Sequence, residues 1–189
     1  MSLNDMLLAC GEKRPPGTKS KLYWTLKEEL QSMPATRADL VIAPAVAAPG
    51  DTKIYDEPFA FVATSGVGYW RSMDILVDTG QLREIGEGEI GSLKHIQEVD
   101  FFLLGNKAIQ QENLDALTAH SGCLIAIIPT QDGSFHVVGD LDNPVFIKPY
   151  TGGSGGDKVG YEMSAMANTG YSSLLYNADT HGINITPNP

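Results

Sequence analysis

The chain has 189 residues, of which 42% are hydrophobic and 19% are charged, and it contains 20 Gly and 11 Pro. This length fits one domain, and the apolar content suffices for a folded core, so the composition excludes a chain that is disordered throughout. The formal net charge of −10 opposes non-specific attraction to a nucleic-acid backbone, because that binding depends on Lys and Arg neutralising phosphates.

Residues 1–18 include the run Gly-Glu-Lys-Arg-Pro-Pro-Gly, which disfavours both helix and central strand and predicts an extended N-terminal arm. This segment lacks the basic and apolar regions of a signal peptide, so we expect a product made in the cytoplasm. No apolar run approaches the roughly 20 residues of a membrane helix, and we expect no membrane partner. A single β-rich domain is predicted over 19–176, with a polar C-terminal tail over 177–189.

The first elements of the domain carry mixed signals. The aromatic-rich segment 20–25 predicts a strand, and 26–33 predicts a short helix that Pro34 ends. The apolar segment 39–48 contains Pro44, which favours an edge strand or a buried connector over a helix.

The middle of the chain predicts a series of strands. Alternating apolar residues favour strand over 53–64, which Pro58 should split, and again over 69–79. The segment 81–91 mixes glycines with acids and predicts a hairpin tip or a bulged edge. A long strand, with room for a bulge near Gln97, is predicted over 92–104.

The C-terminal half begins with the one convincing helix, about 106–120, which is followed by a glycine and then by a buried strand over 123–129. Residues 134–138 should pair back as a hairpin. The glycine-rich segment 150–157 predicts a mobile loop, and 158–167 alternates as an amphipathic strand. Shorter strands are predicted over 145–149 and 171–176.

Each candidate catalytic or ligand-binding pattern is incomplete. A phosphate-binding loop over 150–159 fails because Lys158 follows Asp157 instead of Gly. The four histidines lie on different predicted elements, and Cys10 and Cys123 have no metal-binding or disulfide context. The chain is therefore expected to have no catalytic residues, cofactor or metal, although a hydrolase with a dispersed site stays an alternative.

The order of these pieces resembles a group of phage and prophage tail tube proteins or related virion structural proteins. The resemblance rests on SKLYW, MPAT, GEGEIGSLKH, CLIAIIP, DGSFHVVGDLDNPVFI and GGSGGDKVGYEMSAMA, in that order, and is strongest over 106–176. It implies a mainly β (α+β) fold, an antiparallel β-sandwich or barrel-like sheet with one flanking helix. It also implies a virion subunit that joins copies of itself into a hexameric ring, meets other phage tail proteins and passes DNA as non-specific cargo.

The expected subunit interface combines exposed edges with flexible glycine segments. Its predicted residues are Tyr69, Trp70, Arg71, Arg83, Glu84, Glu87, Glu89, Gly152, Gly153, Gly155 and Gly156, together with the N-terminal arm. The alternative function is a ligand-binding β-sandwich module for carbohydrate or peptide, with Tyr23, Trp24, Tyr69 and Trp70 as a stacking surface.

Overall fold

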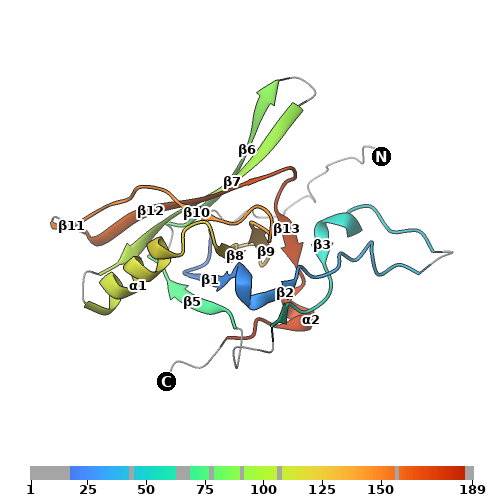
Figure 1. The fold of residues 1–189 in the computed structure, drawn as a ribbon, viewed down its shortest axis with the longest axis horizontal. Helices are drawn as coiled ribbons and strands as arrows, with labels where there is room; N and C mark the ends of the chain where they lie inside the picture. The colour runs from blue at the N-terminus through green and yellow to red at the C-terminus, as the bar shows by residue number, and fades with distance from the viewer. Residues whose placement is uncertain are drawn as a thin grey trace.

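The computed structural model describes residues 18–42, 45–62, 69–76, 79–89, 92–105, 108–155 and 158–185. The fold is mainly β, with two sheets packed as a sandwich (Figure 1). The strands are β1 Lys21–Leu26, β2 Leu30–Ser32, β3 Ile54–Tyr55, β4 Ala60–Phe61, β5 Arg71–Asp74, β6 Gln81–Glu89, β7 Ser92–Leu104, β8 Leu124–Pro129, β9 Phe135–Val138, β10 Phe146–Ile147, β11 Thr151–Gly155, β12 Lys158–Thr169 and β13 Leu174–Tyr176. The helices are α1 Ala108–Ala119 and α2 Ala178–His181, and single 3-10 turns span Lys27–Glu29 and Asp51–Lys53.

Two sheets make up the sandwich. The central sheet has six strands in the order β3-β13-β9-β8-β1-β5, in which only the β3–β13 pair is parallel. The outer sheet has the order β10-β12-β7-β6, and β11 also pairs with β12. All of its pairs are antiparallel. A two-stranded ribbon, β2-β4, lies apart from both sheets.

The central strand β8 is buried on both faces, which explains its continuous apolar sequence. Leu124, Ala126 and Ile128 belong to the core between the two sheets, where they meet apolar residues of β1, β7, β12 and α1. Ile125 and Ile127 belong to a second core on the opposite face of the central sheet. That second core is aromatic-rich and contains Tyr55, Phe59, Trp70 and Tyr176. Two cores thus share one sheet.

The prediction of a mainly β sandwich with a flanking helix is confirmed, and no sheet of the described residues closes into a barrel. The strand predicted over 92–104 matches β7, and the helix predicted over 106–120 corresponds to α1. β7 keeps an unshifted register against both neighbours, so it has no bulge near Gln97. The strand of 53–64 is divided into β3 and β4 on the two sides of Pro58, as expected.

The helix predicted over 26–33 is wrong. Those residues form one 3-10 turn and then β2, where Leu30 pairs with Phe61 of β4. The side chain of Leu30 is buried in the second core. A pairing partner distant in sequence therefore overrides the local helical spacing.

The segment 39–48 is neither a strand nor a buried connector in its described residues. It belongs to a long loop between β2 and β3 that extends away from the sandwich (Figure 1). The side chains of Ile42 and Val46 are 85% and 91% exposed. This apolar segment therefore lies on the surface and not in the core.

The glycine-rich segment 150–157 was predicted as a mobile loop, but its described part forms β11. Thr151 to Gly155 pair in register with Glu162 to Lys158 of β12. Gly152 lies so close to the ring of Tyr161 that an added Cβ would stand 2.1 Å from Cδ1. The glycines therefore permit a close strand pairing, because no side chain competes with the ring for space.

The chain ends differ from expectation where the structure describes them. Residues 178–181 form α2, and Ile185 bridges to Trp70, so this part of the predicted tail packs on the domain. Asn177 also donates a hydrogen bond to Asp56, with an Nδ2–Oδ1 distance of 2.7 Å. The predicted arm of 1–18 lies outside the described residues except for Thr18, which bridges to Thr130.

Candidate functional site

The outer sheet has an open edge at each end. Among the described residues, β6 pairs only with β7, while β10 and β11 pair only with β12. β6 and β11 therefore each turn one row of backbone N–H and C=O groups away from the sheet, whereas β10 is covered, because the Ile147 N–H donates to the Ser121 hydroxyl. Such edges are ready to pair with a strand of another chain.

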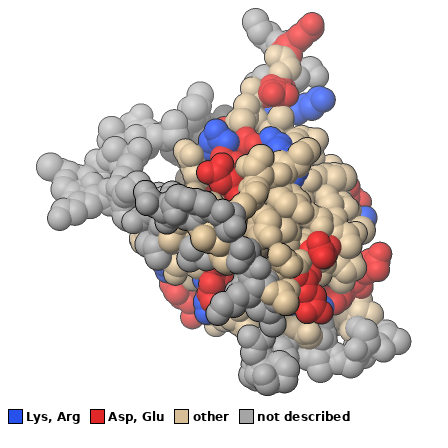
Figure 2. Space-filling model, turned by 90° about the vertical axis from the view of Figure 1, so that its left-hand side faces the viewer, with Lys and Arg blue, Asp and Glu red and all other residues tan. Residues whose placement is uncertain are grey.

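The β6–β7 hairpin is the most prominent of these features. It pairs without a register shift from Gln81 opposite Asp100 to Glu89 opposite Ser92, and its end extends beyond the sandwich (Figure 1). All of β6 is exposed except the half-buried Leu82. Acidic side chains lie on the hairpin, which projects at the top of Figure 2. The predicted interface residues Glu87 and Glu89 lie near its end.

Glu84 has a different role from its neighbours because it faces the central sheet. Its carboxylate accepts a hydrogen bond from the backbone N–H of Ser173, with an N–Oε1 distance of 2.8 Å, and another from the Ser173 hydroxyl. Ser173 is 8% exposed and directly precedes β13. This contact connects the β6–β7 hairpin to the central sheet.

The Ser173 Oγ also lies 2.9 Å from His136 Nδ1 of β9. A carboxylate, a serine and a histidine thus lie together, and these are the residue types of a hydrolase triad. The order of the bonds is wrong for that chemistry. A carboxylate can only accept, so the Ser173 hydroxyl donates to Glu84 and its oxygen is left to accept from His136. In a triad the imidazole accepts the serine proton and the acid binds the imidazole. This group therefore acts as a structural connection.

The outward face of the outer sheet carries a network of ion pairs. Glu98 contacts Lys148 and lies 3.4 Å from Arg83, while Ser164 donates to it with an O–O distance of 3.0 Å. Arg83 also pairs with Asp100. The hydrogen bond from Lys148 holds the pKa of Glu98 below its usual value despite the opposing effect of burial. Arg83, a predicted interface residue, is thus partly committed to contacts within its own chain.

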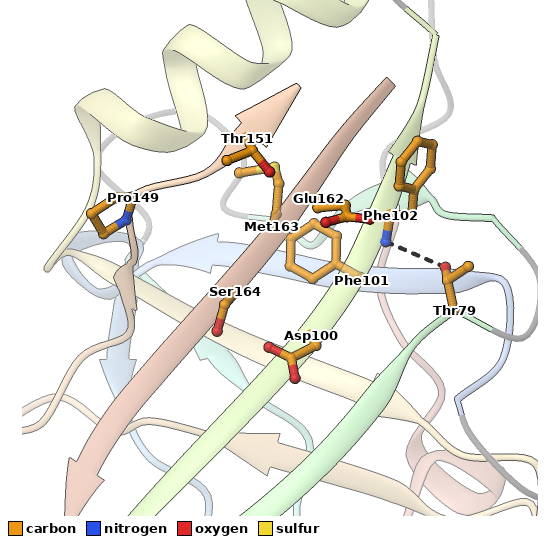
Figure 3. A pocket seen from close by; sticks show the side chains of 9 residues that line it. All are labelled: Thr79, Asp100, Phe101, Phe102, Pro149, Thr151, Glu162, Met163 and Ser164. Atoms are coloured by element: carbon orange, nitrogen blue, oxygen red, sulfur yellow. Dashed lines mark hydrogen bonds between the residues drawn. The ribbon is translucent and has the colours of Figure 1, made fainter. Parts of the chain in front are cut away.

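A groove of about 380 Å³ lies next to this network (Figure 3). Its lining includes the carboxylates of Asp100 and Glu162, the hydroxyls of Ser164 and Thr151, and the ring of Phe102. Asp100 is already paired with Arg83, and no histidine, cysteine or lysine lines the groove. The lining therefore offers no activated nucleophile beside a base.

The opposite edge of the sheet is built from small and aromatic residues. The predicted interface glycines Gly152, Gly153 and Gly155 lie on β11, whereas Gly156 lies outside the described residues. Just before β11, the ring of Tyr150 meets that of Tyr161 edge to face, with 5.9 Å between centroids. The two groups of predicted residues, on β6 and on β11, thus occupy the two opposite ends of one sheet.

The predicted residues 69–71 lie elsewhere, at the β5 edge of the central sheet. Trp70 is 1% exposed within the second core, so its side chain cannot reach a partner. Arg71 binds Glu29 through both terminal nitrogens, at 2.9 and 2.7 Å, and its guanidinium stacks 4.6 Å from the Tyr69 ring centroid. Trp24 is likewise buried at 4% exposure, so neither Trp ring is available to the stacking surface expected for a carbohydrate or peptide ligand.

The sequence reasoning missed one exposed feature, the apolar side chains of Leu40, Ile42 and Val46 in the β2–β3 loop. The available signal was the run 40–50, which has two prolines and no charged residue. Proline-interrupted apolar segments are poor strands, and this one also lacks the polar positions that alternate on a half-buried strand.

The described residues form a two-sheet β-sandwich with a projecting hairpin, in which β6 and β11 each pair on one side only. None of the described helices has the length and apolar character needed to cross a bilayer. Within the described ranges, no three His, Cys, Asp or Glu side chains are grouped so as to hold a metal ion. No family model, curated protein or solved structure matches the chain.

Proposed function

We propose that the chain is a self-assembling structural subunit, of the kind that forms phage tail tubes or related virion parts. The observation that carries this proposal is the outer sheet, which within the described ranges ends at opposite sides in β6 and β11, each paired with a strand on one side only. A sheet of this kind can be continued by the same sheet of a second copy. The contact would be heterologous, because β6 of one copy meets β11 of the next.

Strand direction supports this pairing. The outer sheet alternates strictly, so β6 and β12 run one way while β7 and β11 run the other. Placing β6 of one copy beside β11 of another therefore continues the antiparallel pattern. The glycines of β11, and Gly86 and Gly88 of β6, present little side-chain bulk at the junction.

Heterologous contacts close into a ring when the rotation between copies allows it. The resemblance noted in the sequence suggests six copies per ring, stacking into a tube within a virion, with other tail proteins at its ends. The net charge of −10 suits a conduit that does not bind DNA tightly, because like charges repel. In this proposal the DNA is cargo and the subunit performs no catalysis.

Light scattering and negative-stain electron microscopy of the purified chain test the proposal. We expect rings or tubes to appear as concentration rises. Persistent monomers at high concentration and at every salt condition would overturn it.

Two adjacent proline variants, Gly86→Pro and Glu87→Pro, test the β6 edge itself. Successive N–H groups along a strand alternate between its two edges, so one variant removes a bond to β7 and the other removes an outward N–H. We expect one of the two to keep the hairpin, as judged by β-sheet circular dichroism and proteolysis, yet to lose assembly. Unchanged assembly by both folded variants would show that β6 is not the joining edge.

A further inference from the structure

The β2–β3 loop presents three apolar side chains to solvent on a support held by polar contacts. Leu40, Ile42 and Val46 are 41%, 85% and 91% exposed. We name these three residues the apolar loop tip. Scattered exposed apolar residues are ordinary, but three within one projecting loop that has no charged residue over 40–50 form a concentrated group.

The base of this loop is held in place by many interactions. Arg37 Nε lies 2.9 Å from Asp56 Oδ2, and the Arg37 N–H donates to Ile54 O. Asp51 accepts from the Ala48 N–H at 2.7 Å. Thr36 and Asp39 form a local turn through side-chain and backbone bonds. These contacts keep the loop tip away from the chain's own core.

Covering exposed apolar side chains with a partner lowers the free energy, because apolar surface is removed from water. A lipid surface is disfavoured as this partner, because anionic headgroups would repel a chain of charge −10. A second copy of the chain fits better as this partner, since a second group of exposed apolar residues lies at the end of the molecule opposite the β2–β3 loop. That group contains Tyr150 and Val159, 38% and 37% exposed.

Tyr150 and Val159 belong to one surface, which we name the aromatic patch. Val159 and Tyr161 are two residues apart on β12 and so share a face of the sheet, and the ring of Tyr161 contacts that of Tyr150. In Figure 1 the β11–β12 end and the β2–β3 loop lie at opposite ends of the molecule.

From these observations we propose that the apolar loop tip of one copy binds the aromatic patch of a neighbouring copy. The two surfaces lie too far apart to meet within one chain, so the contact is heterologous and continues from copy to copy. The inference rests on the proposed self-assembly and adds a second contact, distinct from the pairing of β6 with β11.

The double variant Ile42→Asp/Val46→Asp tests the contribution of the loop tip. Both positions are exposed, so the subunit should fold normally, and its thermal unfolding checks this. We expect the concentration needed for assembly, measured by light scattering, to rise at least about tenfold. A matched control, Thr52→Asp/Gln111→Asp, adds the same charge at exposed positions outside both surfaces and should assemble like the wild type.

A disulfide test locates the partner surface directly. In a background with Cys10→Ser and Cys123→Ser, one tagged copy carries Val46→Cys and a differently tagged copy carries Val159→Cys. Oxidation should join the two tags, whereas Thr52→Cys in place of Val46→Cys should give little product. Absence of the mixed product, or equal product from the control, would overturn the proposed contact.

The outcomes separate this inference from the proposed function. If the wild type never assembles, the proposed function fails. If the wild type assembles and the double variant assembles equally well, the function stands and the loop contact is wrong. Cosedimentation with neutral phosphatidylcholine vesicles that is lost in the double variant would instead assign the loop tip to a membrane and overturn the contact between copies.

Discussion

At the scale of single residues, Glu84 connects the projecting hairpin to the central sheet. It is the β6 carboxylate that reaches across to the central sheet, where it satisfies both the N–H and the hydroxyl of Ser173. Glu87 lies three residues further along the same strand and also carries an exposed carboxylate, but it is near the hairpin end, away from Ser173. The two residues therefore form a matched pair for mutation.

Replacing Glu84 with Ala should lower the free energy of unfolding by about 1 to 3 kcal/mol, because Ser173 is buried and would lose the acceptor for its N–H and its hydroxyl. Glu87→Ala should change it by less than about 0.5 kcal/mol, since the residue is exposed. Urea denaturation of the two variants beside the wild type measures both values. Equal effects would mean that the Glu84–Ser173 contact does not stabilise the fold.

At the scale of elements, the strands that the sequence predicts correctly are those whose hydrophobic pattern lies within the strand itself. The run Leu124–Pro129 is apolar throughout because both faces are buried, and β12 alternates because one face meets the core. β11 was missed because its glycines show no strand pattern, although it joins the adjacent strand β12. The other failures involve partners far along the chain, since Leu30 joins Phe61 and Glu84 meets Ser173 across 89 positions. Local spacing contains no information on such pairings.

The same limit applies to the candidate site. Sequence reasoning named residues on both β6 and β11, yet it could not place them at opposite ends of one sheet. It also named Trp70 both as an interface residue and as part of an aromatic stacking surface. The structure instead buries the Trp70 ring edge to face against Phe59, with centroids 4.9 Å apart.

The β2–β3 loop provides a pH prediction at this scale. Asp56 holds the loop base through hydrogen bonds from Arg37 and Asn177, which lower its pKa from an ordinary value of 3.8 to about 2. A carboxyl whose pKa is lower in the folded state binds fewer protons there than in the unfolded state. Its contribution is therefore present above about pH 4 and is lost as pH falls toward about 2.

We expect the wild type to lose stability across this window more steeply than Asp56→Asn, in which the titrating group is absent. Urea unfolding between pH 5 and pH 2 compares the two slopes. Asp179→Asn, on the neighbouring α2, serves as a control that should retain the steep slope of the wild type. Identical slopes for the wild type and Asp56→Asn would show that the Arg37–Asp56 pair does not support the loop.

At the scale of the whole molecule, charge and shape act in opposite directions. The sheet edges left open among the described strands and the exposed apolar residues favour association between copies, whereas a net charge of −10 on every copy opposes it. The ion pairs of the outer sheet, such as Arg83–Asp100 and Lys148–Glu98, are formed within one chain. Backbone pairing and apolar contact, rather than ion pairs between copies, should therefore hold an assembly together.

This balance predicts the direction of the salt effect. Raising the ionic strength from about 0.01 M to about 0.15 M shortens the screening length from about 30 Å to about 8 Å, which weakens repulsion between acidic copies and leaves strand pairing nearly unchanged. We therefore expect assemblies to form at lower protein concentration as sodium chloride is added, measured by light scattering. Lowering the pH from 7 toward the pI of about 4.7 should act in the same direction, because it reduces the net charge. Dissociation on adding salt would indicate instead that ion pairs between copies hold the assembly together, and it would contradict an interface built from sheet edges and apolar contacts.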